Sequence, residues 1–596
     1  MSTTTPYEFL YRFRDNEFVQ NQMIEKMAEL AKLRKVSNFK KLFQDYVKAQ
    51  KKAAGIVLAD STTQFEGQEL ELNCGQWRAD EYGITREGPY GGEIEACNHP
   101  ILPVMRLINI DTGVEKLQIA YRKGKQWRHV IAEKKVLASN NVILDLANVG
   151  IAVTSENAKY LVQYLHDIEA LNYDRIPERN SVSRFGWIHD QGFSPYVENL
   201  VYDGESSFKG LFDSVRQQGS FEKWLDAAKA VRAGASVPAR AILAAAFASP
   251  LVSMAEALSF FVHLWGSESG TGKTVGLMLA ASVWADPQAG KYIKSFNSTM
   301  VSLELAAGFV NHLPLILDEF QMVKNKKDFE GIVYMLAEGI GKGRGAKSGG
   351  VRETPTWKNC ILTSGEMPIT NFMTGAGAFN RIVEIECTKK LFPDPMAVLA
   401  AVKSNYGHAG RRFIEHLQEE GAASRVKALY AQHYRQITQS DTTEKQAMAG
   451  AVLLTADQLA TEWIFCDGKA LQYPEIAEFL QTKAEVDINE RAYDYICETV
   501  AANAQRFLPA AETGEIWGKF LGDQAYIIRS IFERICELGG YSSRATLSWL
   551  MRKGLIETTQ SAAGKAIPTK LCKLNGGTVR CVVLQLKADT EWLDDF

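Results

Sequence analysis

The sequence predicts a multidomain α/β protein whose core is a P-loop nucleotide-binding domain, with a parallel sheet covered by helices on both faces. Two motifs predict this core. Residues 259–282 read as a strand, a glycine-rich turn, Lys-Thr and a helix, and a later apolar run ends in Asp318-Glu319. Between about residue 205 and residue 425, strand-like and helix-like segments alternate. Such alternation is typical of a mainly parallel sheet.

The glycine-rich turn reads Gly266-Ser-Glu-Ser-Gly-Thr-Gly-Lys-Thr274. Its glycines let successive N–H groups face one phosphate chain, and the N-terminus of the next helix adds partial positive charge. Lys273 is expected to reach the β- and γ-phosphates of ATP, and Thr274 to ligate Mg²⁺. The strict pattern has glycine at 267, where this chain has Ser267. The predicted nucleotide-binding residues are Ser269, Gly270, Thr271, Gly272, Lys273 and Thr274.

The second motif supplies the acids of the predicted site. Asp318 is expected to hold Mg²⁺ through its water shell, and Glu319 to polarise the attacking water as general base. A later strand, residues 359–364, ends in polar residues, and Ser364 is expected to orient that water beside the phosphates. Together with Lys273, these residues predict an enzyme that hydrolyses ATP with Mg²⁺.

Length and composition limit the class of protein. The 596 residues suggest roughly four domains. A hydrophobic content of 46% and a net charge of -3 fit a globular protein with no overall attraction to nucleic acid. The nine cysteines include no CxxC pair, and the N-terminus lacks a secretory signal, so a cytoplasmic protein with reduced thiols is expected. The apolar stretch 241–265 is predicted to be core and not a membrane span.

The chain divides into segments of different character. The first segment, residues 1–55, carries eleven basic and six acidic residues. This excess of positive charge fits a segment that attracts DNA, a solvated helical face or an oligomerisation helix. The predicted segments are a basic helical segment (1–55), a β-rich domain (56–200), the nucleotide-binding core with its lid (201–425), a helical connector (426–510), a winged-helix domain (511–587) and an acidic tail (588–596).

A basic, glycine-rich loop, residues 339–350, lies between the acid pair and the next core strand. Its positive residues are Lys342, Arg344 and Lys347. In a ring motor such a loop can face the central channel and grip DNA phosphates. A solvated loop, or a contact to the nucleotide of a neighbouring subunit, remains as an alternative.

Arg381 follows a glycine-containing loop, 375–380, and precedes a strand. An arginine at this place suits an arginine finger, which contributes about 10³–10⁵ in rate in the right geometry. A structural salt bridge is the alternative.

The end of the chain predicts a helix from Ala525 to Leu538, a glycine turn, a second helix and a hairpin, which together describe a winged helix. Arg544, Arg552 and Lys553 are its candidate contacts to DNA phosphates, although winged helices also bind proteins. The acidic, aromatic tail 588–596 fits docking to a replication protein or a frayed terminus.

Several motifs resemble the domain-of-unknown-function family 927: residues 263–274, 315–319, 341–344 and 364–366, together with 74–77 and 405–410. The resemblance covers about residues 70–555. It implies an AAA+ core like that of the minichromosome maintenance helicases, working as a hexameric ring with 3′-to-5′ translocation for a mobile genetic element. It also implies that Arg381 acts on the ATP of the neighbouring subunit, and that Lys342 and Arg344 lie on a channel hairpin.

The leading functional prediction is therefore an ATP-dependent DNA helicase or translocase that acts on single-stranded and forked DNA. The alternative is an ATP-gated initiator or loader switch without processive unwinding, in which the winged helix selects a DNA site. A protein-remodelling machine is less favoured, because the 339–350 loop has no aromatic residue.

Overall fold

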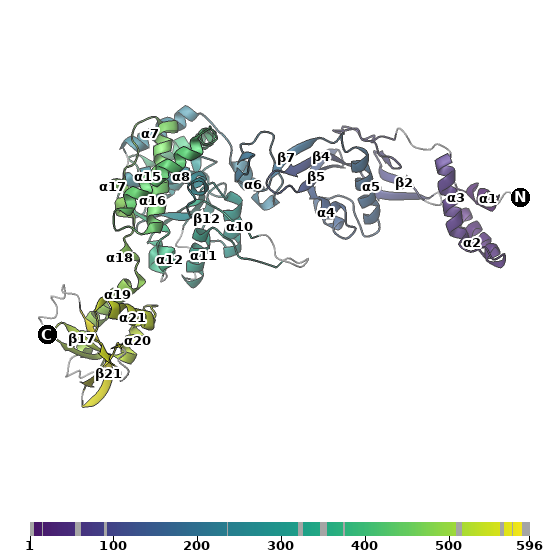
Figure 1. The fold of residues 1–596 in the computed structure, drawn as a ribbon. Coiled ribbons are helices and arrows are strands. Elements are labelled where there is room, and N and C mark those ends of the chain that lie inside the picture. Colours follow the sequence, from purple (N-terminus) through teal and green to yellow (C-terminus); the bar gives the residue numbers. More distant parts are fainter. Residues whose placement is uncertain are drawn as a thin grey trace. The chain divides into compact units, whose positions relative to one another are not determined.

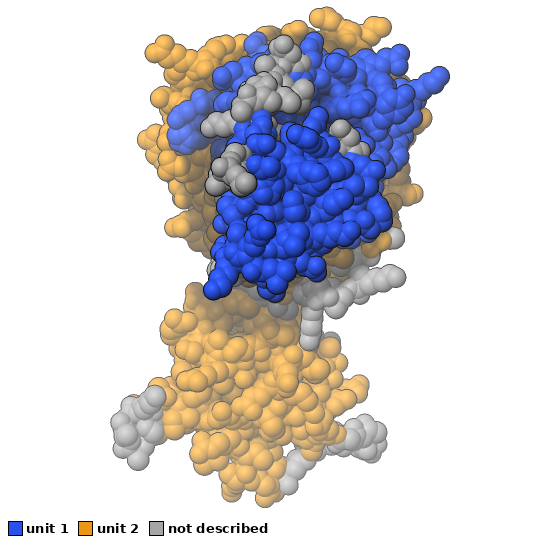
Figure 2. Space-filling model, turned by 90° about the vertical axis from the view of Figure 1, so that its right-hand side faces the viewer, with its two compact units in different colours: residues 1–183, 188–206 blue, residues 184–187, 207–596 orange. Residues whose placement is uncertain are grey.

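The computed structural model forms two compact units: residues 1–183 with 188–206, and residues 184–187 with 207–596 (Figure 2). Each unit is described by itself, with the element labels of Figure 1. The structure describes residues 5–14, 16–53, 61–88, 92–234, 236–319, 326–345, 354–373, 376–507, 515–560, 566–574 and 576–586.

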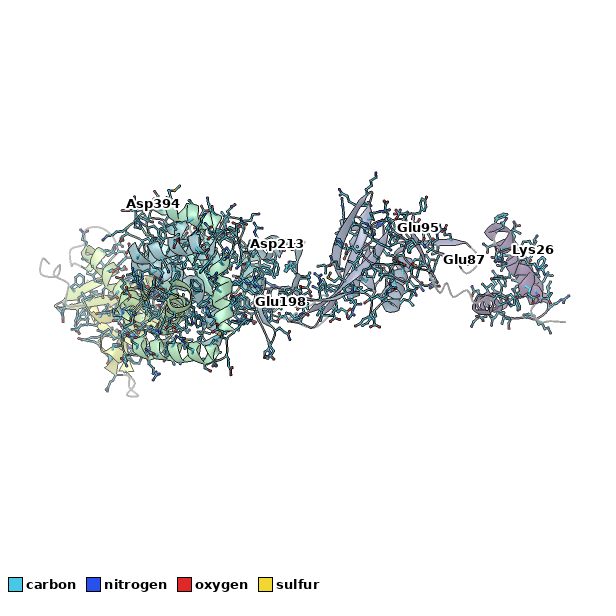
Figure 3. All side chains as sticks on the ribbon, turned by 90° about the horizontal axis from the view of Figure 1, so that it is seen from above. Lys26, Glu87, Glu95, Glu198, Asp213 and Asp394 are labelled. Carbon is cyan, nitrogen blue, oxygen red and sulfur yellow. The ribbon has the colours of Figure 1, made fainter. Side chains whose placement is uncertain are left out.

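Three helices lie at the N-terminal end of the first unit: α1 (Thr5–Tyr11), α2 (Glu17–Leu33) and α3 (Phe39–Ala53). Apolar side chains from all three, including Leu10, Ile24 and Phe43, form a small core of their own. Basic side chains such as Lys26 on α2 lie on its surface (Figure 3). The basic character expected from the sequence therefore lies on the outside of a helical cluster.

The rest of the first unit is built on two sheets, with strand orders β1-β2-β3 and β10-β7-β4-β5-β6. The β4–β5 hairpin turns at Gly113 and the β5–β6 hairpin at Gly124, both with positive φ. Their bounds are β1 (Arg78–Asp80), β2 (Gly83–Glu87), β3 (Glu93–Cys97), β4 (Ile101–Asn109), β5 (Glu115–Lys123), β6 (Gln126–Glu133), α4 (Lys134–Leu137), α5 (Ala158–Leu171), β7 (Glu178–Val182), β9 (Gly192–Ser194) and β10 (Val201–Tyr202).

A five-stranded sheet forms the centre of the second unit, in the order β12-β13-β14-β11-β15. All its strand pairs are parallel, as the sequence predicts. Every residue of β14 and all but the last of β11 are buried, so both faces of the sheet are covered. The strands are β11 (Phe260–Trp265), β12 (Lys294–Ser295), β13 (Leu315–Asp318), β14 (Cys360–Gly365) and β15 (Ile382–Glu386).

Helices alternate with these strands and continue beyond them (Figure 1). One, α8, is long and apolar enough to cross a membrane by length and composition, but most of it is buried as a core helix. The helices are α6 (Ser206–Ser214), α7 (Phe221–Gly234), α8 (Val237–Met254), α9 (Lys273–Ser282), α10 (Met300–Val310), α11 (Lys326–Glu338), α12 (Ala376–Phe379), α13 (Pro395–Ser404), α14 (His408–Leu417), α15 (Ala422–Thr438), α16 (Glu444–Ala460), α17 (Tyr473–Ile476) and α18 (Lys483–Val486).

A buried ion-pair network joins α7 to the end of α16. The Arg232 guanidinium donates to Asp457 at 2.7 Å and to Asp467 at 2.8 Å, and it also bonds Thr461. It lies 4.4 Å from the centroid of the Phe465 ring. The side chains of Arg232 and Asp457 are almost fully buried, so removing one charge would leave the other without compensation.

Arg232→Met is therefore expected to destabilise the second unit by about 3–5 kcal/mol. The measurement is the shift of the urea unfolding midpoint. Arg411→Met is the matched control, because Arg411 makes an exposed pair with Glu415. Loss of that exposed pair should cost only about 0–1 kcal/mol. Equal shifts for the two variants would contradict a structural role for the Arg232 network.

The C-terminal part of the second unit combines helices with an antiparallel sheet, in the order β16-β17-β21-β20. The sequence predicts one helix from Ala525 to Leu538, and this is wrong at its start. Ala525 pairs with Leu584 of β21, so strand pairing takes residues that have helical character on their own. The elements are α19 (Ile488–Ala502), β16 (Gly518–Leu521), β17 (Gln524–Ile528), α20 (Arg529–Leu538), α21 (Ser543–Lys553), β18 (Thr559–Gln560), β19 (Ala566–Ile567), β20 (Lys570–Leu574) and β21 (Gly577–Gln585).

Candidate active site

The glycine-rich loop runs from the end of β11 to the start of α9. Gly270 and Gly272 have φ values of +79° and +98°, which glycine adopts without strain. A Cβ on Gly266 would lie 2.9 Å from the backbone oxygen of Cys387, so the close approach falls at 266. Ser267 is exposed. The departure from the strict pattern therefore falls on an open position of the loop.

Lys273 begins α9 and turns its ammonium back across the loop. Its Nζ donates to the carbonyl oxygens of Gly266 at 2.8 Å and Glu268 at 3.1 Å, with Thr271 Oγ1 at 3.4 Å. Thr271 is buried, and its own carbonyl accepts from the N–H of Leu391 at 2.8 Å. The loop thus encloses the charge of Lys273 and is itself held by the segment that follows β15.

The acid pair stands at the end of β13. The Ser364 hydroxyl, near the end of β14, donates to Asp318 Oδ1, which also accepts from the backbone N–H of Glu319 at 3.0 Å. Glu319 has a φ of +63°, a conformation that non-glycine residues seldom adopt and that often marks a functional site. Its side chain is exposed. The carboxylate of Asp318 is therefore held by its neighbours, while that of Glu319 faces outward.

His263, in the middle of β11, was not identified from the sequence as part of this site. Its two ring nitrogens lie 2.8 Å from Thr363 Oγ1 and 3.0 Å from the carbonyl oxygen of Met367. Burial lowers the pKa of His263 to about 4, so the ring is neutral near pH 7. It ties β11 to β14 and to the segment just after Ser364. The signal in the sequence was a polar residue inside an otherwise apolar strand.

One cavity of about 550 Å³ brings most of the predicted residues together. Because parallel strands end at the same edge of a sheet, the loop after β11, the acids after β13 and the end of β14 all meet there. Glu366 also lines it, a residue for which the sequence pattern suggests no chemistry. The predicted residues that line the cavity are Ser269, Gly270, Thr271, Gly272, Lys273, Thr274, Asp318, Glu319 and Ser364.

Arg381 lies away from this cavity. It directly precedes β15, and its carbonyl accepts from Phe261 at the start of β11, so it stands at the opposite edge of the sheet. Its guanidinium lies 5.2 Å from the centroid of the Tyr334 ring. The residue is only 7% exposed, yet its Nε and Nη1 have no hydrogen-bond partner among the described residues. The salt-bridge alternative therefore finds no partner in the described part of the chain.

The basic loop connects α11 to β14, and the two sides of its base are hydrogen-bonded to each other. Ile340 bridges Thr356, and Gly341 N–H donates to Pro355 O at 2.8 Å. The side chain of Lys342 reaches solvent, whereas Arg344 is bound to Glu304 of α10 by two hydrogen bonds. Lys347 lies outside the described residues. The free positive charge expected at Arg344 is thus already paired with a carboxylate.

The three C-terminal residues predicted to contact DNA all lie on α21 and are exposed. Arg544 and Arg552 are eight residues apart, about 80° around a helix, so they share one side. Lys553 lies on another side, with its Nζ 5.6 Å from the centroid of the Trp549 ring. These three residues therefore do not form one surface.

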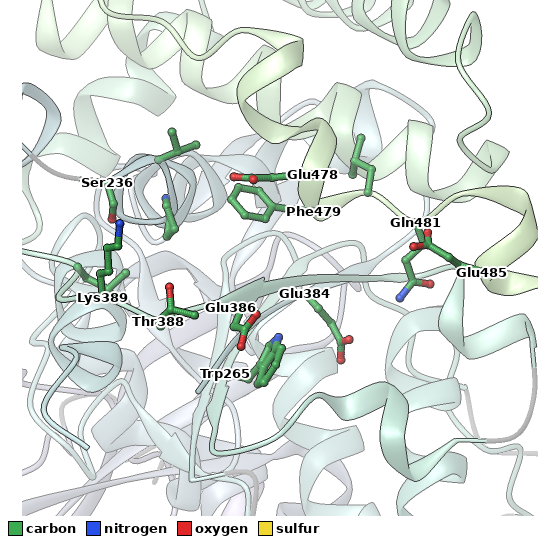
Figure 4. Close-up of a pocket in the computed structure, with 15 residues that line it drawn as sticks. Ser236, Trp265, Glu384, Glu386, Thr388, Lys389, Glu478, Phe479, Gln481 and Glu485 are labelled. Atoms are coloured by element: carbon green, nitrogen blue, oxygen red, sulfur yellow. The ribbon is translucent and has the colours of Figure 1, made fainter. Parts of the chain in front are cut away.

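A second cavity, of about 670 Å³, lies beside the edge strand β15 (Figure 4). Carboxylates of Glu384, Glu386, Glu478 and Glu485 surround it, with Trp265 beside them. None of the site residues predicted from the sequence lines this cavity.

Comparison with known proteins identifies two parts of the chain. Residues 76–356 match the model of the domain of unknown function DUF927. This segment of the chain is a DUF927 domain. The DUF927 match includes the glycine-rich loop and the acid pair but ends before Ser364 and Arg381. Residues 487–589 match the Cch helix turn helix domain, which includes α20 and α21.

A solved structure, "SCCmec type IV Cch - active helicase", shares the fold at 18% identity and a TM-score of 0.61, covering 86% of this chain and 98% of that chain. Two structures of the NrS-1 C-terminal region match over 80% and 82% of the chain and 96% of theirs, at 12% and 10% identity. Their TM-scores of 0.29 and 0.28 are too low to carry an argument. No curated protein matches the chain.

Proposed function

We propose that this protein is an ATP-dependent DNA helicase or translocase. The observation that carries the proposal is the single cavity that unites Lys273, Thr274, Asp318, Glu319 and Ser364 at the carboxyl edge of a parallel sheet. A fold shared with a helicase of known activity and a helix-turn-helix match support the DNA part of the proposal.

The residues of the cavity fit ATP with Mg²⁺. The glycines of the loop have no side chains that would fill the space for the phosphates. Among the described residues, the ammonium of Lys273 is bound only by oxygens of the loop itself. Thr274 and Asp318 supply the hydroxyl and carboxylate oxygens that Mg²⁺ prefers. When bound, the metal would neutralise phosphate charge. Lys273 would orient the phosphates, Glu319 would accept a proton from the attacking water, and Ser364 would hold Asp318 in place.

The order of the strands supports assignment to the AAA+ class, because β14 stands between the phosphate-loop strand and the acid strand. Arg381 at the opposite edge of the sheet supports a ring in which each subunit supplies this residue to the ATP of its neighbour. The resemblance to the minichromosome maintenance helicases supports a hexamer. The resemblance to replicative helicases supports replication of a mobile genetic element in the cytoplasm as its setting.

DNA contacts are proposed at two places. Lys342 offers a positive charge that reaches solvent on the loop between α11 and β14. Arg544 and Arg552 offer a second pair on α21, in what we propose to be a winged-helix domain. The acidic tail 588–596 lies outside the described residues, and a replication protein remains its proposed partner.

The helix-turn-helix match favours one alternative, an ATP-gated initiator or loader that selects a DNA site. A switch of this kind should prefer one duplex sequence. A translocase that grips phosphates should not, and its affinity should fall steeply with salt.

The test is the ATP hydrolysis rate with and without single-stranded DNA of several sequences. We expect stimulation that is independent of sequence, and a loss of about 10²–10³-fold or more in Lys273→Ala, because a charge that stabilises the transferring phosphoryl group is removed. Lys291→Ala removes an exposed lysine outside the cavity and should hydrolyse ATP like the wild type. A hydrolysis rate that DNA does not change would contradict the proposed translocase activity. An undiminished rate in Lys273→Ala would contradict the assignment of the ATP site.

A further inference from the structure

Glu304 is a fully buried carboxylate in α10, a helix whose other buried residues are apolar. A buried charge is costly unless it is paired and hydrogen-bonded. Arg344 supplies the pair: its Nη1 donates to Glu304 Oε1 at 3.0 Å and its Nη2 to Oε2 at 2.6 Å. The backbone N–H of Lys342 donates to the same Oε1 at 3.0 Å. One carboxylate therefore binds the basic loop at two points.

The shape of the loop fits this carboxylate. A Cβ on Gly341 would lie 2.5 Å from Glu304 Oε1 and 2.8 Å from Pro355 Cγ, so any side chain here would push the loop off α10. A Cβ on Gly343 would meet nothing within 4 Å. The glycine at 341 is thus required by its close approach to Glu304, whereas the glycine at 343 is not required by packing.

We propose that Glu304 and Arg344 form a clamp that fixes the base of the loop, so that Arg344 is a positioning residue and Lys342 is the residue that contacts nucleic-acid phosphate. The proposal rests on the proposed function for its DNA part. The geometry separates the two roles, because both terminal nitrogens of Arg344 face Glu304, whereas the Lys342 ammonium has no partner among the described residues.

The clamp also links the loop to the acid strand. Glu304 belongs to α10, which leads through a short connection into β13, and β13 ends at Asp318. A fork–fork pair between guanidinium and carboxylate fixes direction as well as distance. The loop base is therefore attached to the helix that leads into the acid strand.

The experiment compares Arg344→Met, Glu304→Gln and the double variant in three measurements. The first is the ratio of ATP hydrolysis with single-stranded DNA to hydrolysis without it. We expect each single variant to reduce this ratio at least about ten-fold and the double variant to reduce it no further, because residues that act as one unit are not additive. The second measurement is DNA binding at several salt concentrations. Lys342→Met should reduce its salt dependence by about 0.7 in log–log slope for each phosphate that is no longer neutralised.

Glu304→Gln decides between the two roles of Arg344. If Arg344 were a phosphate ligand, removing the charge of Glu304 would release it, and DNA would bind more tightly. Tighter binding or unchanged stimulation in Glu304→Gln, together with the absence of stimulation in Arg344→Met, would overturn the clamp.

The third measurement needs neither DNA nor ATP: it is the hydrogen-exchange rate of the Lys342 amide. We expect Arg344→Met to raise it at least ten-fold, and an unchanged rate would overturn the clamp. Should Arg344→Met fail to fold, Arg344→Lys replaces it, because lysine keeps the charge but cannot form the fork. A wild type that DNA does not stimulate would contradict the proposed function, while the exchange rate would still test the clamp.

Discussion

Glutamine in place of Glu319 is expected to lower ATP hydrolysis by about 10²–10⁴-fold, the usual contribution of a general base. Glutamine keeps the size of the side chain but cannot take a proton from water. The backbone of Glu319 is set by its hydrogen bond to Asp318, so the change should leave the loop and Lys273 in place. Binding of ATP, measured by calorimetry, should therefore remain close to that of the wild type.

Glu366 provides the matched comparison, because it lines the same cavity and carries the same charge. Glu366→Gln should affect hydrolysis much less than Glu319→Gln. If Glu366→Gln were the variant that stops hydrolysis, the general base would be Glu366 and the assignment of Glu319 would be wrong. Loss of ATP binding in Glu319→Gln would indicate a structural role for the residue.

Arg381→Ala is expected to cost about 10³–10⁵-fold in hydrolysis rate, the contribution of an arginine finger. Arg381 stands at the edge of the sheet opposite its own cavity, so its target should be the ATP of a neighbouring subunit. Mixing tests this directly. Arg381→Ala and Lys273→Ala are each expected to be inactive alone, but in a mixed ring the intact Arg381 of one meets the intact loop of the other.

Recovered hydrolysis in the mixture would support action between subunits, and a mixture as inactive as its parts would contradict it. Tyr334→Phe is the control, because phenylalanine keeps the aromatic face on which the guanidinium lies. That variant should hydrolyse ATP at a rate near that of the wild type. Similar losses in Tyr334→Phe and Arg381→Ala would point to local packing as the cause.

The core of the fold was predictable because its signals are local. A strand, a glycine-rich turn and Lys273 lie within one short segment, and the acids directly follow another strand. Parallel strands end at one edge, so the meeting of these motifs follows from the fold class. The importance of Gly266 was not predictable, because the oxygen that it approaches belongs to Cys387, far along the chain.

The contrast between local signals and distant contacts also explains where the structure differs from the sequence predictions. Arg344 reads as a free positive charge, because its partner Glu304 lies in an apolar helix forty residues earlier in the chain. Ala525 reads as the start of a helix, because the strand that pairs with it comes near the end of the described chain. The Arg232 network likewise joins residues far apart in sequence. Such partners are set by tertiary packing, which local patterns do not encode.

The separation of Arg381 from the cavity has a consequence for the cell. If each catalytic centre needs a residue from a second molecule, an isolated molecule hydrolyses almost no ATP, however much nucleotide is present. Assembly follows mass action, so hydrolysis per molecule rises with the number of copies. At low copy number the protein would hydrolyse little ATP. Hydrolysis would begin only once the concentration of the protein exceeds the threshold for assembly. The position of Arg381 in the sheet would in this way make the hydrolysis rate of each molecule depend on the concentration of the protein.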